Sequence, residues 1–310
     1  MLGVALVTGA AGFIGERVCR ALQREGWQIR AVDAFRDLPR NRAAAERLNR
    51  RGISVEACDL SVAKLDTWLR GSDLIIHLAG RPGVRDRDSA AMKRDNVVAV
   101  SRMLRALGSS TETHLVFASS SSVTTAAGRG NGNLTYAESK RQAEQLVQDA
   151  PVRATILRLF SVYGPGQRSG MAFAAACQAL STDRTLSIFG DGSHARDWTY
   201  VDDVVDAIHA SQAAPPGLYE VGAGKPTSLI DALGLLEQVA GRRLCLDFQP
   251  AHPLDAAQTR ADPELSLPGW SARIPLRDGL RLQWQHHSQR QHTRRTITAA
   301  GETALTPSPA

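Results

Sequence analysis

The chain has 310 residues, 43% of them apolar and 22% charged, so it can bury a large core and is not a disordered polymer. Its formal charge is +6, and the excess is concentrated in residues 271–310, where six arginines face only two carboxylates. A basic end without interleaved aromatic residues argues against a nucleic-acid groove through the body of the protein.

Membrane and secreted classes are also disfavoured. No stretch approaches the roughly 20 apolar residues of a membrane-spanning helix, and Met1 leads into strand-like Val4–Val7 without a basic leader. The four cysteines (Cys19, Cys58, Cys177, Cys245) lie far apart, without CxxC spacing or a nearby histidine. This spacing indicates neither a zinc site nor a disulfide framework. We therefore expect a cytoplasmic protein with reduced thiols, no metal and no membrane partner.

Short apolar runs alternate with helical, Arg- and Ala-rich segments in the first half, as in βαβ units that form a parallel sheet. The expected strands are Val4–Val7, Ile29–Val32, Ser54–Ala57, Leu74–His77, His114–Ala118 and Thr155–Leu159. Helices are expected near 13–25, 40–51, 62–70, 91–107 and 136–149. The order predicts an α/β fold with a Rossmann-type doubly wound sheet, whose ligand crevice lies at the carboxyl ends of the strands.

After residue 160 the pattern is interrupted by glycine and proline, which indicates a smaller lobe built from discontinuous segments. We expect a nucleotide-binding domain over 1–160, joined by about 198–216, and a substrate-binding lobe over 161–197 and 217–285. Residues 286–310 are polar and aperiodic, and we expect a disordered tail there.

A glycine-rich turn follows the first strand, with the spacing GxxGxxG, and leads into a helix. Such a turn lets the backbone approach a pyrophosphate, and the helix N-terminus offers it free N–H groups. Asp33 ends the second strand, where a carboxylate accepts hydrogen bonds from the adenosine ribose and favours NAD over NADP. Arg36 and Arg40 lie close enough to keep NADP as an alternative. The turn residues expected at the cofactor are Gly9, Gly12, Phe13, Ile14 and Gly15.

Two further strand ends face the same crevice. Asp59 and Leu60 follow the third strand, and Leu78 and Ala79 follow the fourth, where adenine and the linking groups of the cofactor would lie. His77, at the end of the fourth strand, reads as a structural histidine rather than a catalyst.

The second constellation is a serine run, 119–122, at the end of the fifth strand, followed by Tyr136 and Lys140. Residues at i and i+4 share a helix face, so the ammonium can lower the pKa of the phenol from about 10 and also hold the nicotinamide ribose. The phenolate can take a proton from a substrate hydroxyl as hydride leaves the same carbon. Ser120 would orient that hydroxyl. Ser120, Tyr136 and Lys140 are the predicted catalytic residues, the last two also contacting the cofactor.

The chain resembles an extended short-chain dehydrogenase/reductase of the NAD-dependent nucleotide-sugar epimerase/dehydratase family over about residues 2–285. The matching segments occur in the family's order: Thr8–Gly15, His77–Ala79, Asn96–Val97, the serine run, Tyr136 with Lys140, Val162–Gln167 and Phe189–Trp198. The resemblance implies tightly held NAD, a sugar nucleotide between the two lobes, Arg196 on its pyrophosphate or ribose, and a homodimer formed by the helices near 91–107 and 136–149. A planar guanidinium suits such a phosphate.

Within the family the chain most resembles UDP-glucuronate 4-epimerases. Serines fill the positions of the acid–base pair of the 4,6-dehydratases, which argues against dehydration. By resemblance, Ser121 and Ser122 would border the sugar, and Ser161 and Arg168 would hold its carboxylate. We therefore expect conversion of UDP-glucuronate to UDP-galacturonate through a 4-keto intermediate, with Tyr136 as the base.

Three alternatives stay open: a UDP-glucose or UDP-N-acetylglucosamine 4-epimerase, a UDP-glucuronate decarboxylase, and a non-catalytic NAD-binding protein on the same fold. The chain departs from the family at two places. The loop over 123–135, which by resemblance borders the sugar, is short and rich in glycine and asparagine and so affects the choice of substrate. Glu220 replaces a common asparagine, and the sequence offers no reason for it.

Overall fold

The computed structural model of the chain describes residues 2–83, 86, 88–109, 112–124, 135–251 and 256–303, with side chains up to residue 292. The chain forms two compact units. Unit 1 comprises Met1–Val162, His194–Thr227 and His252–Arg273, and unit 2 comprises Tyr163–Ser193, Ser228–Ala251 and Ile274–Ala310. Most of the Gly/Asn-rich loop, 125–134, and the last residues, 304–310, lie outside the described residues.

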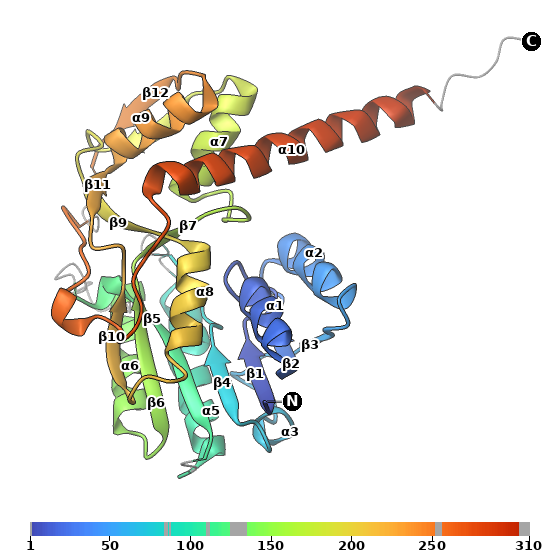
Figure 1. Cartoon of the computed structure of the whole chain (residues 1–310), viewed down its shortest axis with the longest axis vertical. Coiled ribbons are helices and arrows are strands. Elements are labelled where there is room, and N and C mark those ends of the chain that lie inside the picture. Colours follow the sequence, from blue (N-terminus) through green and yellow to red (C-terminus); the bar gives the residue numbers. More distant parts are fainter. Residues whose placement is uncertain are drawn as a thin grey trace, which may run out of the picture. The chain divides into compact units, whose positions relative to one another are not determined.

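Unit 1 is built on a seven-stranded sheet in the order β10-β6-β5-β4-β1-β2-β3 (Figure 1). The pairings are parallel, so the carboxyl ends of neighbouring strands meet at one edge. The strands are β1 (Val4–Thr8), β2 (Gln28–Asp33), β3 (Val55–Ala57), β4 (Leu74–His77), β5 (His114–Ser120), β6 (Arg153–Leu159) and β10 (Gly217–Val221). All six predicted strands are confirmed, as is the Rossmann-type fold, and β10 adds a seventh strand.

Helices connect these strands close to the predicted positions. They are α1 (Gly15–Glu25), α2 (Leu38–Asn49), α3 (Asp66–Leu69), α4 (Ser89–Met92), α5 (Ala99–Leu107), α6 (Tyr136–Asp149) and α8 (Val201–Ala210). Between α4 and α5 the chain forms a π-helical segment, η1 (Lys93–Val98). Short 3₁₀ turns occur at η2 (Ser121–Thr124) and η3 (Pro263–Leu265). Among the helices that the structure describes, none combines the length and the apolar run of a membrane span.

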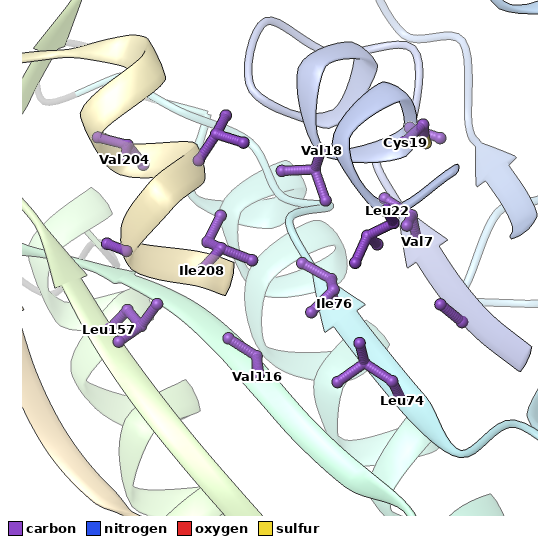
Figure 2. Packing of buried hydrophobic residues seen from close by; sticks show 14 of the residues in the cluster. Val7, Val18, Cys19, Leu22, Leu74, Ile76, Val116, Leu157, Val204 and Ile208 are labelled. Carbon is purple, nitrogen blue, oxygen red and sulfur yellow. The ribbon is translucent and has the colours of Figure 1, made fainter. Parts of the chain in front are cut away.

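The sheet is buried on both faces because successive strand residues point to opposite sides. In β1, Ala5 and Val7 join one apolar cluster and Leu6 joins the other. Figure 2 shows the first cluster, in which strand residues such as Val7 and Ile76 pack against Val18 of α1 and Ile208 of α8. The second cluster packs the opposite face against α3, α5 and α6. The strand ends are therefore fixed by two layers of buried side chains.

A three-stranded sheet, in the order β11-β9-β7, consists of β7 (Ser161–Tyr163), β9 (Ala195–Tyr200) and β11 (Pro226–Ser228). Asp197 in β9 is fully buried and accepts hydrogen bonds from three backbone amides, those of Ala223 (2.7 Å), Gly224 (2.9 Å) and Ala261 (3.0 Å). One carboxylate thus joins β9 to the segment after β10 and to residues 256–273. This is why these segments belong to unit 1, although we expected 217–285 in the substrate-binding lobe.

Glu220, whose presence the sequence left unexplained, belongs to a buried ion cluster. Arg158 in β6 makes a two-pronged contact with Glu144 of α6 (3.0 and 2.8 Å), and its Nη1 lies 3.6 Å from Glu220 Oε1. The other oxygen of Glu220 accepts the N–H of Asp262 at 2.8 Å. Glu144 and Glu220 are 3% and 5% exposed, so Arg158 compensates two carboxylates that water does not reach. The cluster ties α6, β6 and β10 together.

Unit 2 contains α7 (Ala172–Thr182), β8 (Leu186–Phe189), α9 (Leu229–Ala240), β12 (Leu246–Gln249) and α10 (Leu276–Thr303). β8 and β12 pair in parallel, and α10 packs against α7 and α9. The predicted disordered tail is wrong for residues 286–303, which continue α10. Leu280 and Gln283 are buried on this helix, and the Gln- and Arg-rich sequence beyond them has neither glycine nor proline before residue 301.

Truncating Arg158 tests the buried cluster. We expect Arg158→Ala to lower the free energy of unfolding by about 3 kcal/mol, because it leaves two buried carboxylates without a cation. Arg273→Ala removes a solvent-exposed ion pair with Asp206 and should cost less than about 1 kcal/mol. Urea unfolding of both variants measures the difference, and equal losses would contradict the role given to the cluster.

Candidate active site

The glycine-rich turn between β1 and α1 is packed too tightly for any other residue. Gly9 has φ of +68°, and a Cβ there would lie 2.8 Å from the N of Ala79. A Cβ on Gly15 would lie 2.1 Å from the carbonyl oxygen of Gly9. Within the described chain, no hydrogen bond uses the backbone N–H of Phe13 or Ile14, just before α1. The turn therefore offers two donors at the positive end of a helix, which suits a pyrophosphate.

Asp33 lies at the carboxyl end of β2 and is 7% exposed. It accepts hydrogen bonds from the N–H of Phe35 at 2.7 Å and from that of Ala11 in the turn at 3.1 Å. Burial raises the pKa of Asp33, while these two hydrogen bonds and the charge of Arg40 act against the shift. The carboxylate thus holds the turn against the end of β2, where a ribose hydroxyl could reach it.

Arg36 and Arg40, the two arginines for which NADP stayed an alternative cofactor, already have carboxylate partners. Arg36 lies 2.6 Å from Asp59 and 3.4 Å from Asp95, and Arg40 lies 4.0 Å from Asp37. Burial acts to raise the pKa of Asp59, but hydrogen bonds from Ser61 and the charge of Arg36 bring it below its usual value. Leu60, next to Asp59, is buried. The positive charge of Arg36 is therefore neutralised locally.

The end of β4 is fixed to β1 through Thr8. The hydroxyl of Thr8 accepts the N–H of Ala79 at 3.2 Å and lies 2.9 Å from Nδ1 of His77, and the N–H of Leu78 donates to the Thr8 carbonyl at 3.2 Å. His77 is stacked on Phe117, and its buried Nε2 has no hydrogen-bond partner among the described residues. Burial, with the charge of Lys140, lowers the pKa of His77 to about 3. His77 is therefore a neutral structural residue.

Ser120, Tyr136 and Lys140 lie together at the ends of β5 and the start of α6. The hydroxyl of Thr135 caps α6 by accepting the N–H of Glu138. Lys140 is buried, donates to the carbonyl of Ala118 at 2.7 Å and lies 4.9 Å from the centre of the Phe117 ring. Burial lowers the pKa of Lys140 to about 8, against the charge of Glu144. The ammonium is thus easily deprotonated for a lysine.

The expected depression of the Tyr136 pKa is not found. Burial raises the pKa of Tyr136, and a hydrogen bond with Ser120 only partly opposes this. The physical reason is that the cost of removing the charged phenolate from water is larger than the stabilisation that the hydrogen bond with Ser120 gives it. Ser122 donates to Ser120 at 3.0 Å, and Ser121 starts the 3₁₀ turn η2. Ser120, Ser122 and the phenol of Tyr136 therefore form one hydrogen-bonded group.

Asn96 is a positioning residue to which the sequence assigned no role. It is 2% exposed and lies in η1. Its amide donates to the carbonyl of Arg81 (3.1 Å) and to Oγ of Ser139 (2.9 Å), and its oxygen accepts the N–H of Arg81 (2.7 Å). One side chain thus connects the loop after β4 to α6. The matching segment Asn96–Val97 was the signal in the sequence, but it does not reveal the π-helical turn that holds Asn96, a kind of turn that occurs often at functional sites.

The predicted substrate residues are divided between the two units. Ser161, at the start of β7, and Arg196, in β9, belong to unit 1. Arg196 donates to the carbonyls of Ala195 (2.9 Å) and Ala256 (2.6 Å). Arg168 belongs to unit 2 and is exposed in the loop before α7.

Known proteins resemble the chain over most of its length. Residues 5–222 match the NAD dependent epimerase/dehydratase family. An uncharacterized UDP-glucose epimerase, YtcB of Bacillus subtilis (strain 168), is 31% identical over 89% of this chain and 95% of its own. The UDP-glucuronate 4-epimerase of Thermodesulfobacterium geofontis (strain OPF15) is 29% identical over 90% of this chain and 94% of its own.

A solved structure shows the same fold. The UDP-glucuronic acid 4-epimerase of Bacillus cereus, in complex with UDP-glucuronic acid and NAD, superposes with a TM-score of 0.83. The two proteins are 28% identical, and the match covers 92% of this chain and 99% of the Bacillus cereus chain.

The neutral state of His77 predicts a pH dependence of stability. The unfolded histidine titrates near pH 6.5 and the folded one near 3, so between these values only the unfolded chain binds the proton. The contribution of His77 to the free energy of unfolding should therefore rise between pH 3 and pH 6.5. Above pH 6.5 neither state binds this proton, so the contribution stays constant. In His77→Gln the slope near pH 5 should be smaller by about 1.4 kcal/mol per pH unit, measured by urea unfolding.

His114 provides the check on this experiment. Burial, with the charge of Arg153, lowers the pKa of His114 to about 4, so His114→Gln should reduce the slope in the same direction and the double variant should reduce it further. A slope that His77→Gln leaves unchanged would mean that the folded imidazole is charged.

Proposed function

The chain belongs to the NAD-dependent epimerase/dehydratase family, and from this premise we propose that it is a UDP-sugar 4-epimerase that converts UDP-glucuronate to UDP-galacturonate. The observation that carries the proposal is the hydrogen-bonded group of Ser120 and Tyr136, with Lys140 on the same helix face, at the strand ends beside the glycine-rich turn. The UDP-glucuronate 4-epimerases of Thermodesulfobacterium geofontis and Bacillus cereus support the choice of substrate.

The residues of the crevice fit NAD. The amides of Phe13 and Ile14 would bind its pyrophosphate, with Gly9, Gly12 and Gly15 allowing the close approach. Asp33 would accept the adenosine ribose hydroxyls, and its negative charge disfavours a 2′-phosphate. Asp59, Leu60, Leu78 and Ala79 would line the adenine and linking groups. Lys140 would exchange the Ala118 carbonyl for the nicotinamide ribose.

The reaction uses Tyr136 as an acid and base at the C4 hydroxyl of the sugar. Lys140 is the cation that would favour the phenolate, and Ser120 would hold the hydroxyl in line with it. When bound, NAD supplies a hydride acceptor that returns the same hydride. Tyr136 would take the hydroxyl proton as C4 is oxidised to a ketone. The 4-keto sugar would then rotate in the site so that its other face is reduced. Tyr136 would return the proton to the new C4 hydroxyl during this reduction.

The carboxylate of the sugar decides between epimerisation and loss of carbon dioxide. In the oxidised glucuronate the ketone lies β to the carboxylate, so the intermediate can decarboxylate. An arginine that holds the carboxylate near the plane of the sugar discourages this, and we assign that role to Arg168, with Ser161 as a second donor. Ser121 and Ser122 would border the sugar and Arg196 would bind the pyrophosphate or ribose.

The named relative in Bacillus subtilis supports a second candidate, a UDP-glucose 4-epimerase. The same Ser120, Tyr136 and Lys140 would serve either sugar, so only the role of Arg168 separates the two. We further propose a cytoplasmic homodimer formed through the helices near 91–107 and 136–149. The four cysteines are free thiols, in keeping with a reducing compartment.

Tyr136→Phe tests the proposed base. Removing the phenol should lower turnover of UDP-glucuronate by about 10²- to 10⁴-fold, because proton transfer at C4 is lost, while bound NAD is retained. Tyr219→Phe is the matched control, since that hydroxyl donates to the carbonyl of Pro215 at 2.9 Å and has no role in the proposed reaction. Products are separated by anion exchange and identified by mass. Full activity in Tyr136→Phe would remove the proposed mechanism.

Arg168→Ala tests the choice of sugar. Loss of a charge-assisted contact should raise the KM for UDP-glucuronate by about tenfold or more and leave the KM for UDP-glucose unchanged, because UDP-glucose has no carboxylate. Arg184→Ala, another exposed arginine of unit 2, is the control. Unchanged efficiency in Arg168→Ala would remove its assigned role. Product from neutral sugars alone would favour the UDP-glucose 4-epimerase. A product of UDP-glucuronate whose mass is lower by one carbon dioxide would establish a decarboxylase.

A further inference from the structure

Helix α10 is joined to α7 and to the loop before it by a row of polar contacts. Gln283 donates to Gln167 at 3.1 Å, Nε2 of His287 lies 2.9 Å from Oγ of Ser181, and Gln291 donates to Gln178 at 3.3 Å. The three α10 residues are spaced at i, i+4 and i+8, so they lie along one face of the helix. Such a face holds two elements together without filling the space between them with apolar side chains.

A cavity of about 180 Å³ lies along this row, entirely within unit 2. Its polar wall is formed by Gln167, Gln178, Gln283, His286, His287 and Arg290. The volume is well below the roughly 300–1,000 Å³ of pockets for drug-sized ligands. A ligand that fills it must therefore be small.

The chemistry of the wall selects the charge of that ligand. Arg290 is a permanent cation, and the glutamine amides and imidazoles can donate hydrogen bonds. In the described part of unit 2, no carboxylate lines the cavity. Cys177, which also lines it, stays a neutral thiol because burial raises its pKa to about 12. The cavity thus offers donors and a positive charge without a competing anion.

From this geometry we propose that the cavity between α7, α10 and the 165–167 loop binds a small oxyanion, such as phosphate, and that the bound anion steadies the loop that carries Arg168. His286, His287 and Arg290 all lie on α10, beyond the residues 5–222 that match the family model. Pro165, Gly166 and Gln167 also line the cavity, and they directly precede Arg168. The consequence for substrate binding rests on the proposed function, but the anion site itself does not.

The test is calorimetric titration of inorganic phosphate into the full chain in the presence of NAD and UDP, at constant ionic strength. NAD and UDP occupy the phosphate sites of the proposed function, and no turnover is required. Arg290→Gln should weaken phosphate binding by about tenfold or more, since it removes the cation. Arg281→Gln, an arginine of α10 that pairs with Asp278 outside the cavity, should leave binding within twofold.

Gln178→Glu is the sharper variant. It keeps the oxygen that accepts the Gln291 amide, so the helix contact is preserved, but it places a negative charge in the wall and should abolish phosphate binding. Amide hydrogen exchange over residues 164–171 should slow on adding phosphate to the unmodified chain and not to Gln178→Glu.

Each result decides part of the proposal. Absence of saturable binding, or equal binding in Arg290→Gln, Gln178→Glu and the unmodified chain, would overturn the anion site. Binding that is lost in both variants but leaves the exchange over 164–171 unchanged would uphold the site and overturn the link to the loop. Failure of epimerase turnover would affect none of these measurements.

Discussion

The site in unit 1 depends on the close approach of the glycine-rich turn to the backbone after β4. Gly9 lies where a Cβ would come within 2.8 Å of Ala79, and Thr8, just before it, binds both Ala79 and His77. This contact fixes the position of the turn relative to the carboxyl ends of β1 and β4. Asp33 then fixes the turn from the other side through Ala11. A larger residue at Gly9 would separate β1 from β4 at the point where the cofactor is proposed to bind.

The polar side chains around this contact hold elements in place rather than reacting. Asn96 connects the loop after β4 to α6, while the cluster of Glu144, Arg158 and Glu220 holds α6 against β6 and β10. Tyr136, Lys140 and Glu144 lie at i, i+4 and i+8 on α6, so the helix that carries the proposed base is anchored by a buried charge one turn beyond its lysine. The positioning contacts and the proposed proton transfer thus lie on the same helix face.

Much of unit 1 could be predicted because its signals are local. Apolar runs predicted the six strands that the structure confirms, and the glycine spacing and the Tyr136–Lys140 spacing predicted the place of the crevice. Three features could not be predicted. β10 is a seventh strand because of pairing with β6, a contact between residues more than 60 positions apart. α10 continues past residue 285 because it packs on α7 and α9, although its composition is polar. The upward pKa shift of Tyr136 follows from burial, which periodicity does not report.

The π-helical segment η1 has a consequence for the tolerance of this chain to length changes. Asn96 points at both Arg81 and Ser139 only because the wider turn over Lys93–Val98 sets its direction relative to the α-helical turns on either side. Each residue of an α-helix advances the side-chain direction by about 100°. Deleting one residue from 93–98 would restore a regular helix and keep it continuous, yet it would rotate Asn96 away from both partners. A change in chain length can therefore leave this helix continuous and still remove the contacts of Asn96 with Arg81 and Ser139.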